Sequence, residues 1–403
     1  MIKTIEKSRA EGSISAPTSK SIAHRLLISA AMADGQKSTI RGITPCEDVL
    51  ATIDCLRSMG VKIEYTNECA EVYGIDFSKA CATEKLHCRE SGSTLRFLIP
   101  LCLISGNEAI LCGSEKLISR PQSVYEEIAK ESGFVFEKNT DSIKLCGKLS
   151  CGEYRVRGDV SSQFISGLMF ALSALSGESK IILTTKIESR SYIDLTIDAL
   201  TRFGASLCWD RDNCILINGG CKLSSVDLTV EGDWSGAAFI EALGKLNGDV
   251  VIEGMNENSK QGDRVCKEYF NALSGGYCEI DIEDCPDLGP ILFAFSAAKF
   301  GGKFTSTKRL RIKESDRVEA MRQELSKFGV DMEVQENSVT ISHSELCTPK
   351  EVLYGHNDHR IVMSMAVLCS LVGGQIDGWE AVNKSYPDFF SDLIKLGVKN
   401  YDT

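Results

Sequence analysis

The sequence lacks any segment that would hold it in a membrane or mark it for export. No stretch approaches the run of about 20 apolar residues that a membrane-spanning helix needs, and residues 1–6 contain no apolar core of a signal peptide. We therefore expect a cytoplasmic protein rather than a membrane or secreted one.

Familiar patterns for metals and disulfides are missing as well. None of the 17 cysteines forms a CxxC pair, and the five histidines show no HExxH spacing. Because the cysteine count is odd and many cysteines sit inside apolar runs, most are expected to be reduced core residues. The sequence predicts neither a metal site nor another cofactor.

An excess of basic charge is also absent, since 45 Lys and Arg stand against 56 Asp and Glu, for a net charge of −11. This balance disfavours nucleic acid and acidic membranes as partners, while leaving room for local basic clusters. A length of 403 residues with 43% hydrophobic and 25% charged side chains is typical of a globular protein with two domains.

What the chain does have is a recurring junction, in which an apolar helical run ends at a glycine. The glycines are Gly60, Gly133, Gly204, Gly275, Gly329 and Gly397, and the first five precede predicted strands over 61–65, 134–136, 205–209, 277–282 and 330–334. A glycine just past a helix supplies the left-handed backbone that closes it. Any α/β protein contains some such links, but spacings of 73, 71, 71, 54 and 68 residues favour six repeated units, three in each half.

A first cluster of polar and basic residues stands at the predicted start of a helix. Pro17 precedes Lys20, Ser21 and Arg25, and the apolar run 26–32 follows. Free amide hydrogens and the positive end of the helix dipole favour an anion there, such as a phosphate. The segment lacks the glycines of a Walker P-loop, and a capped helix with two solvated cations is the alternative.

A second cluster follows the same pattern around Gly92, in the segment 90–96. This glycine would let a ligand approach the backbone while neighbouring hydroxyl groups bind it, at the start of the helix-like stretch 97–104. Arg120 places a guanidinium just before another predicted helix near Gln122.

Neutral hydrogen-bonding side chains form a third cluster. Ser161, Ser162 and Gln163 precede the apolar run 164–175, and the segment from Ser189 to Tyr192 is expected to end the next strand. Such side chains suit a polyhydroxylated or phosphorylated ligand, although ordinary helix capping by serine explains each segment alone.

The densest cluster lies at 308–317. The alternation of Arg309, Arg311 and Lys313 predicts a strand with these cations on one face, and Glu314 and Arg317 stand at the turn into the helix 318–328. A solvated face of ion pairs is the alternative.

Three further pieces complete the pattern. Asp287 opens the helix 291–298, where its carboxylate could cap the helix or accept a proton from a bound hydroxyl. Arg360 precedes the run 361–371, and Lys384 follows later. If every cluster sits at a helix entry, six similar units would converge these entries on one interdomain cleft that binds a ligand with several phosphates or carboxylates.

These residues resemble the family of 5-enolpyruvylshikimate-3-phosphate (EPSP) synthases from Lys20 to Pro387. The motifs that carry the resemblance are Ser19-Lys20-Ser21 with Arg25, Gly92 with Arg96, Arg120-Pro121, Ser161-Ser162-Gln163, Asp287, Lys313-Glu314 with Asp316-Arg317, Asn357-Asp358-His359-Arg360, and Lys384 with Pro387. The resemblance implies a mixed α/β (α+β) fold, a two-domain inside-out α/β barrel of six βαβαββ repeats. It implies one domain at 18–228 and another formed by 1–17 and 229–403, with the active site in the cleft.

The resemblance also implies the reaction. The family transfers the enolpyruvyl group of phosphoenolpyruvate to the 5-hydroxyl of shikimate 3-phosphate and releases phosphate, a step of chorismate and aromatic amino acid biosynthesis. The tetrahedral intermediate requires a proton donor, a proton acceptor and fixed cations. Its two substrates would be the partners, with no nucleic acid or membrane, and we expect a monomer.

Roles carry over to matching positions. By resemblance, the shikimate 3-phosphate contacts are Ser21, Arg25, Ser161, Ser162, Gln163, Ser189, Tyr192 and Lys313. The phosphoenolpyruvate contacts are Lys20, Gly92, Arg120, Arg317, Arg360 and Lys384. Asp287 would be the base for the 5-hydroxyl and Glu314 the acid toward the methylene carbon, and Lys384 could share either proton transfer. Lys20 completes the expected catalytic set.

The chain departs from the family pattern in three places, at Glu90, Phe97 and Arg309, the last facing the substrate phosphate in the family. UDP-N-acetylglucosamine enolpyruvyl transferases are the nearest rival and generally use a loop cysteine, for which Cys112 is the plausible counterpart. A non-catalytic binder of phosphorylated metabolites is the rival from another class. Carboxylates at Asp287 and Glu314 favour an enzyme, because anion binding alone gains nothing from them.

Overall fold

Glycine closes the helices at five of the six predicted junctions. In the computed structural model, which describes Ile2–Thr403, φ is 97° at Gly60, 75° at Gly133, 91° at Gly204, 81° at Gly329 and 86° at Gly397. Met1, which begins the predicted 1–17 segment, lies outside the described residues. The chain divides into two units, Met1–Ser19 with Glu231–Thr403 as unit 1 and Lys20–Val230 as unit 2.

Unit 2 contains three four-stranded sheets. In spatial order, the first sheet consists of β14 (Asp227–Thr229), β3 (Lys37–Arg41), β5 (Cys69–Tyr73) and β4 (Lys62–Thr66). The second consists of β6 (Leu86–His87), β7 (Ala109–Cys112), β9 (Ser142–Cys146) and β8 (Val135–Lys138). The third consists of β10 (Glu153–Val156), β11 (Gly177–Leu183), β13 (Cys214–Gly219) and β12 (Ser206–Arg211). In each sheet the first two strands are parallel and the last two form an antiparallel hairpin.

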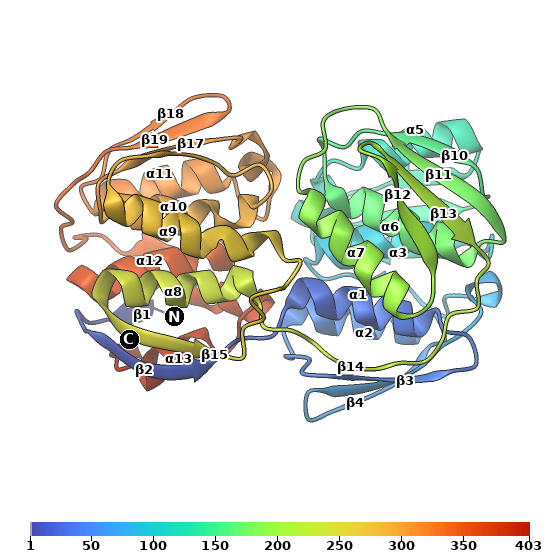
Figure 1. Cartoon of the computed structure of the whole chain (residues 1–403), viewed down its shortest axis with the longest axis horizontal. Coiled ribbons are helices and arrows are strands. Elements are labelled where there is room, and N and C mark those ends of the chain that lie inside the picture. Colours follow the sequence, from blue (N-terminus) through green and yellow to red (C-terminus); the bar gives the residue numbers. More distant parts are fainter. Residues whose placement is uncertain (1) are drawn as a thin grey trace. The chain divides into compact units, whose positions relative to one another are not determined.

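Helices fill the interior of unit 2. They are α1 (Lys20–Ala31), α2 (Glu47–Ser58), α3 (Gly92–Cys102), α4 (Glu115–Ser119), α5 (Ser123–Ser132), α6 (Ser162–Ala174) and α7 (Arg190–Arg202). Mostly apolar side chains on α3 and α6 explain why these two helices are buried. They pack on each other, and Figure 1 shows the strands of the unit outside its helices.

Unit 1 repeats this plan with one difference. Its four-stranded sheets are β20 (Leu353–Tyr354), β21 (Gly374–Asp377), β1 (Ile2–Ile5) and β22 (Asn400–Asp402), and β16 (Glu279–Asp281), β17 (Gly302–Thr305), β19 (Ser338–Ile341) and β18 (Met332–Val334). Its third sheet, in the residues that the structure describes, has only two strands, which are parallel: β2 (Ala10–Ser15) and β15 (Gly248–Glu253).

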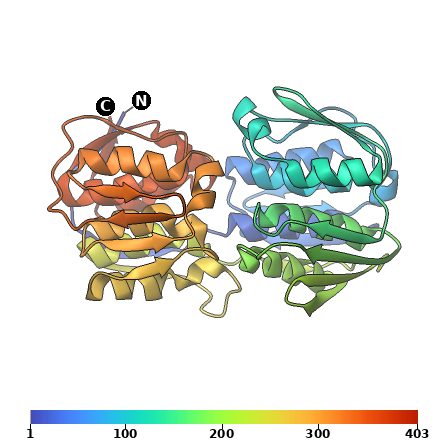
Figure 2. The ribbon, with the colours of Figure 1, turned by 90° about the horizontal axis from the view of Figure 1, so that it is seen from above.

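The helices of unit 1 are α8 (Trp234–Asn247), α9 (Cys266–Gly275), α10 (Gly289–Ala297), α11 (Arg317–Lys327), α12 (His359–Val372) and α13 (Phe389–Lys395). Every residue of α10 is buried, and α8, α10 and α12 pack together in the core. Figure 2 shows the helices of each unit running side by side. No helix among the described residues has the length and apolar character of a membrane span.

Four local predictions were wrong. Gly275 does not adopt the left-handed conformation but is the last residue of α9, although the strand predicted after it is present as β16, which pairs with β17. Residues 308–312 form the 3₁₀ helix η4 (Lys308–Ile312) instead of a strand, because this segment has no strand partner and turns directly into α11.

The segment from Ser189 to Tyr192 begins α7 rather than ending a strand, since β11 already ends at Leu183. Lys384 also departs from the expected helix entry, because it is the last residue of the 3₁₀ helix η5 (Trp379–Lys384). The other basic and serine clusters do precede or begin helices, at α1, α3, α6, α11 and α12.

Close packing of α3 on α6 generates a first test. A Cβ at Gly167 of α6 would clash with the Arg96 carbonyl oxygen and the Tyr125 hydroxyl. We expect Gly167→Ala to lower the free energy of unfolding by about 2 kcal/mol, the usual cost of overpacking. Gly275→Ala, where a Cβ meets nothing within 4 Å, should be neutral or stabilising by up to about 1 kcal/mol. Urea denaturation of both variants measures this, and equal midpoints would contradict the packing argument.

Candidate functional site

One guanidinium gathers three carboxylates in unit 1. Arg317, the first residue of α11, has a side chain only 1% exposed. It donates to Asp358 Oδ2 at 2.9 Å, to Asp287 Oδ1 at 2.8 Å and to Glu314 Oε2 at 2.6 Å. A buried arginine is stable only with such partners, so the start of α11 is built around this cluster.

Asp287 is the most highly paired of the three carboxylates. It lies in the 3₁₀ helix η3 (Pro286–Leu288), 3.3 Å from Lys313 Nζ and 3.2 Å from an Arg360 nitrogen. Burial disfavours its charged form, but Arg360, Lys313 and Arg317 outweigh burial and hold the pKa of Asp287 well below its usual range. The Asp287 carboxylate therefore pairs with three cations, and its two predicted roles, capping the helix or accepting a proton from a bound hydroxyl, stay predictions.

Burial shifts the pKa of Lys313 in the direction opposite to its effect on the pKa of Asp287. It lowers the pKa of the Lys313 amine, as do the neighbouring Arg309 and Arg317, while Asp287 raises it. The net pKa lies below the usual lysine value. Lys313, Glu314 and Arg317 thus lie together with Asp287, and Arg309, 8% exposed, stands nearby in η4.

Asp358 connects this cluster to the start of α12. As N-cap it accepts the Arg360 N–H at 3.0 Å, and it also accepts the Ser315 hydroxyl at 2.9 Å. Arg360 in turn donates to the Asp287 carbonyl oxygen at 3.2 Å. Sequence reasoning included Asp358 in a motif without giving it a role, although Asp at an N-cap is a readable signal.

Lys384 is held next to that helix start. Its Nζ donates to the Asn357 carbonyl oxygen at 2.7 Å, and the residue is 7% exposed. Asn357 and His356 have φ of 52° and 51°, a strained conformation for residues with a Cβ. Their loop is fixed by Glu324, which accepts from Tyr354 N at 3.0 Å and lies 2.9 Å from His356 Nε2.

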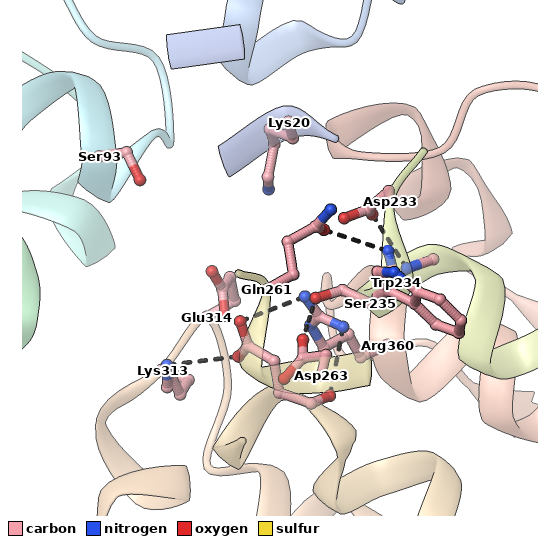
Figure 3. Close-up of polar contacts among 12 residues, drawn as sticks. Lys20, Ser93, Asp233, Trp234, Ser235, Gln261, Asp263, Lys313, Glu314 and Arg360 are labelled. Atoms are coloured by element: carbon pink, nitrogen blue, oxygen red, sulfur yellow. Dashed lines mark hydrogen bonds and ion pairs between the residues drawn. The ribbon is translucent and has the colours of Figure 1, made fainter. Parts of the chain in front are cut away.

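Asp263 is a further carboxyl group that the sequence analysis missed. It lies in the 3₁₀ helix η2 (Gly262–Val265), is 2% exposed and accepts a hydrogen bond from Ser235. Figure 3 shows Asp263 and Ser235 next to Arg360. Burial, reinforced by the charge of Asp287, raises the pKa of Asp263 to about 7.

In unit 2, Arg25 joins α1 to α7. Its guanidinium donates to Thr196 Oγ1 at 2.7 Å, to the Ser21 carbonyl oxygen at 2.7 Å and to the Tyr192 carbonyl oxygen at 2.9 Å. Burial lowers the pKa of Arg25 to about 10. Ser21, Arg25 and Tyr192 are therefore neighbours, as is Ser189, the residue before α7, with φ of 58°.

Lys20 begins α1 and pairs with a carboxylate that the sequence analysis did not single out. Its Nζ lies 2.8 Å from Asp48 Oδ2, and the two side chains are 16% and 14% exposed. Asp48 lies in the first turn of α2, where a carboxylate is favoured by the helix dipole.

The glycine loop and the Ser-Ser-Gln segment meet at the starts of α3 and α6. A Cβ at Gly92 would lie 3.1 Å from an Arg120 guanidinium nitrogen and 3.4 Å from Gln163 Oε1. Gln163 accepts from Arg96 at 2.7 Å and donates to Ser93 Oγ at 3.0 Å. Ser161 caps α6 through the Gln163 N–H, and Ser162 is 4% exposed. Gly92, Arg120 and Gln163 are thus brought together, as a small-anion site requires.

Units of layered helices and sheets, with arginine, lysine and hydroxyl groups at helix starts and paired carboxylates beside them, define the class of the protein. It is an α/β protein whose polar clusters suit phosphorylated or carboxylated ligands and proton transfer.

Comparison with known proteins identifies the family. The family model for EPSP synthase (3-phosphoshikimate 1-carboxyvinyltransferase) matches residues 5–393. Proteins named 3-phosphoshikimate 1-carboxyvinyltransferase from Clostridium kluyveri and Clostridium novyi are each 39% identical, covering 98% and 97% of this chain and 97% and 96% of their own. The chain therefore belongs to the EPSP synthase family.

Solved structures agree on the fold. An EPSP synthase from Acinetobacter baumannii superposes with a TM-score of 0.81 at 24% identity, over 100% of both chains. The enolpyruvyl transferase NikO from Streptomyces tendae gives a TM-score of 0.77 at 14% identity, over 100% of this chain and 98% of its own. The predicted mixed α/β fold, a two-domain inside-out barrel, and the predicted family are confirmed.

Asp263 provides a test of the electrostatics of unit 1. Because its pKa is raised in the folded state, it stabilises the fold when protonated, and this contribution is lost as pH rises from about 4 through about 7. We expect Asp263→Asn to gain stability relative to the wild type between pH 5 and pH 8, by on the order of a few kcal/mol.

Thermal unfolding at pH 5, 6, 7 and 8 measures the difference. Asp281→Asn, at an exposed carboxylate on β16, serves as the control and should follow the wild type. A constant difference between Asp263→Asn and the wild type across this range would refute the raised pKa.

Proposed function

We propose that this chain transfers the enolpyruvyl group of phosphoenolpyruvate to the 5-hydroxyl of shikimate 3-phosphate, with Asp287, Glu314, Lys20 and Lys384 as its catalytic residues. The observation that carries this proposal is the cluster around Arg317. Within it two carboxylates from separate elements, η3 and the turn before α11, share one guanidinium, with Lys313 and Arg360 close by. Family membership supports the same reaction.

The proposed roles follow from charge. Asp287 is ionised, so it can accept the proton of the attacking hydroxyl, but three cations make it a weak base while they all point at it. A substrate that draws Lys313 or Arg360 onto its own anionic groups would release Asp287 and strengthen it as a base. Glu314, three residues before Arg317, is proposed as the acid toward the methylene carbon, with Lys384 able to share a proton transfer.

Cations and backbone donors are proposed to bind the substrates. Shikimate 3-phosphate would use Ser21, Arg25, Ser161, Ser162, Gln163, Ser189, Tyr192, Arg309 and Lys313, and phosphoenolpyruvate would use Lys20, Gly92, Arg120, Arg317, Arg360 and Lys384. Lys20 and Arg25 already have protein partners, Asp48 for the first and Thr196 for the second. A bound phosphate would compete with these contacts, and charge-assisted bonds to a dianion would outweigh them.

Release of inorganic phosphate tests the reaction directly. Purified protein is given phosphoenolpyruvate with shikimate 3-phosphate in one assay and with UDP-N-acetylglucosamine in another. We expect release only in the first. Release only in the second would assign the chain to the sister reaction, and none in either would favour a protein that binds phosphorylated metabolites without catalysis.

Asp287→Asn tests the proposed base. Asparagine keeps the size of the side chain and can still accept a hydrogen bond from Arg317, but it cannot take a proton. We expect kcat to fall at least about 100-fold with a small change in KM, as for loss of a general base. Asp281→Asn, on exposed β16, should keep wild-type kcat. Unchanged kcat in Asp287→Asn would remove Asp287 from the proton transfer.

A further inference from the structure

The two-stranded sheet of unit 1 leaves β15 with an open edge. In the five four-stranded sheets the second strand, which is β3, β7, β11, β17 or β21, lies between a parallel strand and an antiparallel one. β15 occupies the matching position, but within the described part of the chain it pairs only with β2. Figure 1 shows β2 and β15 side by side below α8.

Among residues 2–403, which the structure describes, no strands take the place of this hairpin. In a complete repeat of the same unit, the hairpin of β18 and β19 lies between the end of α11 at Lys327 and the start of β20 at Leu353. After α9 ends at Gly275, β16 begins at Glu279, so no segment remains that could form a hairpin. The sequence shows the same shortening, because Gly275 and Gly329 are 54 residues apart whereas the other junction glycines are 68 to 73 residues apart.

Apolar surface is exposed where the hairpin would lie. Val251 is 56% exposed, and beside it lies a cavity of about 220 Å³ lined in part by Val250, Ile252, Trp234 and Met255. An open strand edge with apolar side chains is a template for another strand.

The pairing of β15 with β2 shows which residues of β15 offer backbone hydrogen-bonding groups to the open edge. Ala16 N donates to Glu253 O at 2.8 Å, so Glu253 directs its backbone groups toward β2. Successive residues of a strand direct their backbone N–H and C=O groups to opposite sides. Val251 and Asp249 therefore also direct these groups toward β2, while Val250 and Ile252 direct theirs toward the open edge.

We infer that the open edge of β15 pairs with β15 of a second copy of this chain, as an antiparallel ladder about a two-fold axis. A two-fold contact is self-complementary, because the donors and acceptors of Val250 on one copy meet the acceptors and donors of Val250 on the other. The result is one continuous four-stranded sheet, the number of strands in the five other sheets.

Charge selects the register. With the axis at Val250, the segment Gly248–Ile252 pairs with its own copy and Asp249 lies opposite Val251. With the axis at Val251, the segment Asp249–Glu253 pairs instead, and Asp249 lies opposite Glu253. Opposed carboxylates are destabilising, so the ladder centres on Val250, where the open-edge groups form a hydrogen-bonded pair.

This interface is small, and its affinity should be modest. A ladder of this length buries less than the roughly 1,200–2,000 Å² of standard interfaces, and the net charge of −11 on each copy opposes association. We expect a monomer at low concentration, in keeping with the sequence-based prediction, and a dimer at tens of micromolar, favoured by salt that screens the repulsion.

Sedimentation velocity from about 1 to 200 µM tests the proposal with the full-length chain. The expected result is a reversible shift from 44.1 kDa to twice that mass, about 88 kDa. A chain that stays monomeric throughout, or one that forms open-ended aggregates, would overturn the two-fold ladder.

Charge variants at Val251 test the register. Val251→Asp places a carboxylate opposite Asp249 and should weaken the dimer at least about tenfold, whereas Val251→Lys places an ammonium there and should strengthen it. Val135→Asp, at a valine on the edge strand β8 that is 39% exposed, is the matched control and should dimerise like the wild type.

Equal effects of Val251→Asp and Val251→Lys would place the interface elsewhere and refute the register. Because β15 contains none of the proposed substrate contacts, all three variants should keep the phosphate release of the wild type. The oligomeric result is therefore independent of whether the proposed reaction is correct.

Discussion

Burial of Arg317 is the constraint on which the rest of unit 1 depends. A guanidinium with 1% exposure must be neutralised within the protein, and Asp287, Glu314 and Asp358 do so from three segments far apart in the chain. Removing one partner of such a group typically costs about 3–5 kcal/mol. The same contacts that satisfy Arg317 fix the positions of the two carboxylates proposed to move protons, so stability and chemistry rest on the same contacts.

Repetition explains why so many polar side chains lie at helix starts. Each repeat places a helix after a parallel strand, and the first turn of that helix leaves N–H groups that need an acceptor. Serine and aspartate caps satisfy some of them, at Ser91, Ser161 and Asp358. Basic residues in the same turns then find both a rigid support and an electrostatic field that favours anions.

The repeats are not all equally complete. Loss of a hairpin after α9 leaves the helices of unit 1 packed, since Phe270 and Leu273 of α9 are fully buried. The loss affects only the outer layer, at β15. A six-fold repeated fold can therefore lose part of one sheet without disturbing the core that carries the Arg317 cluster.

The sequence alone determined the repeats and most of the helix entries, because these depend on local chemistry. A glycine with positive φ closes a helix wherever it occurs, and a lysine or arginine in a first turn can be read from neighbouring residues. The same local reasoning failed at 308–312, where alternating cations look like a strand face but the chain has no strand to pair with.

Tertiary structure decided which side chains share a charge environment. Nothing in the sequence connects Asp263 with Arg360, or Lys20 with Asp48, because these contacts join segments that only packing brings together. The raised pKa of Asp263 and the lowered pKa of Asp287 likewise depend on burial and on neighbours distant in the chain. Spacing along the sequence revealed a shortened repeat, but only the strand pairing showed that β15 is the strand left open.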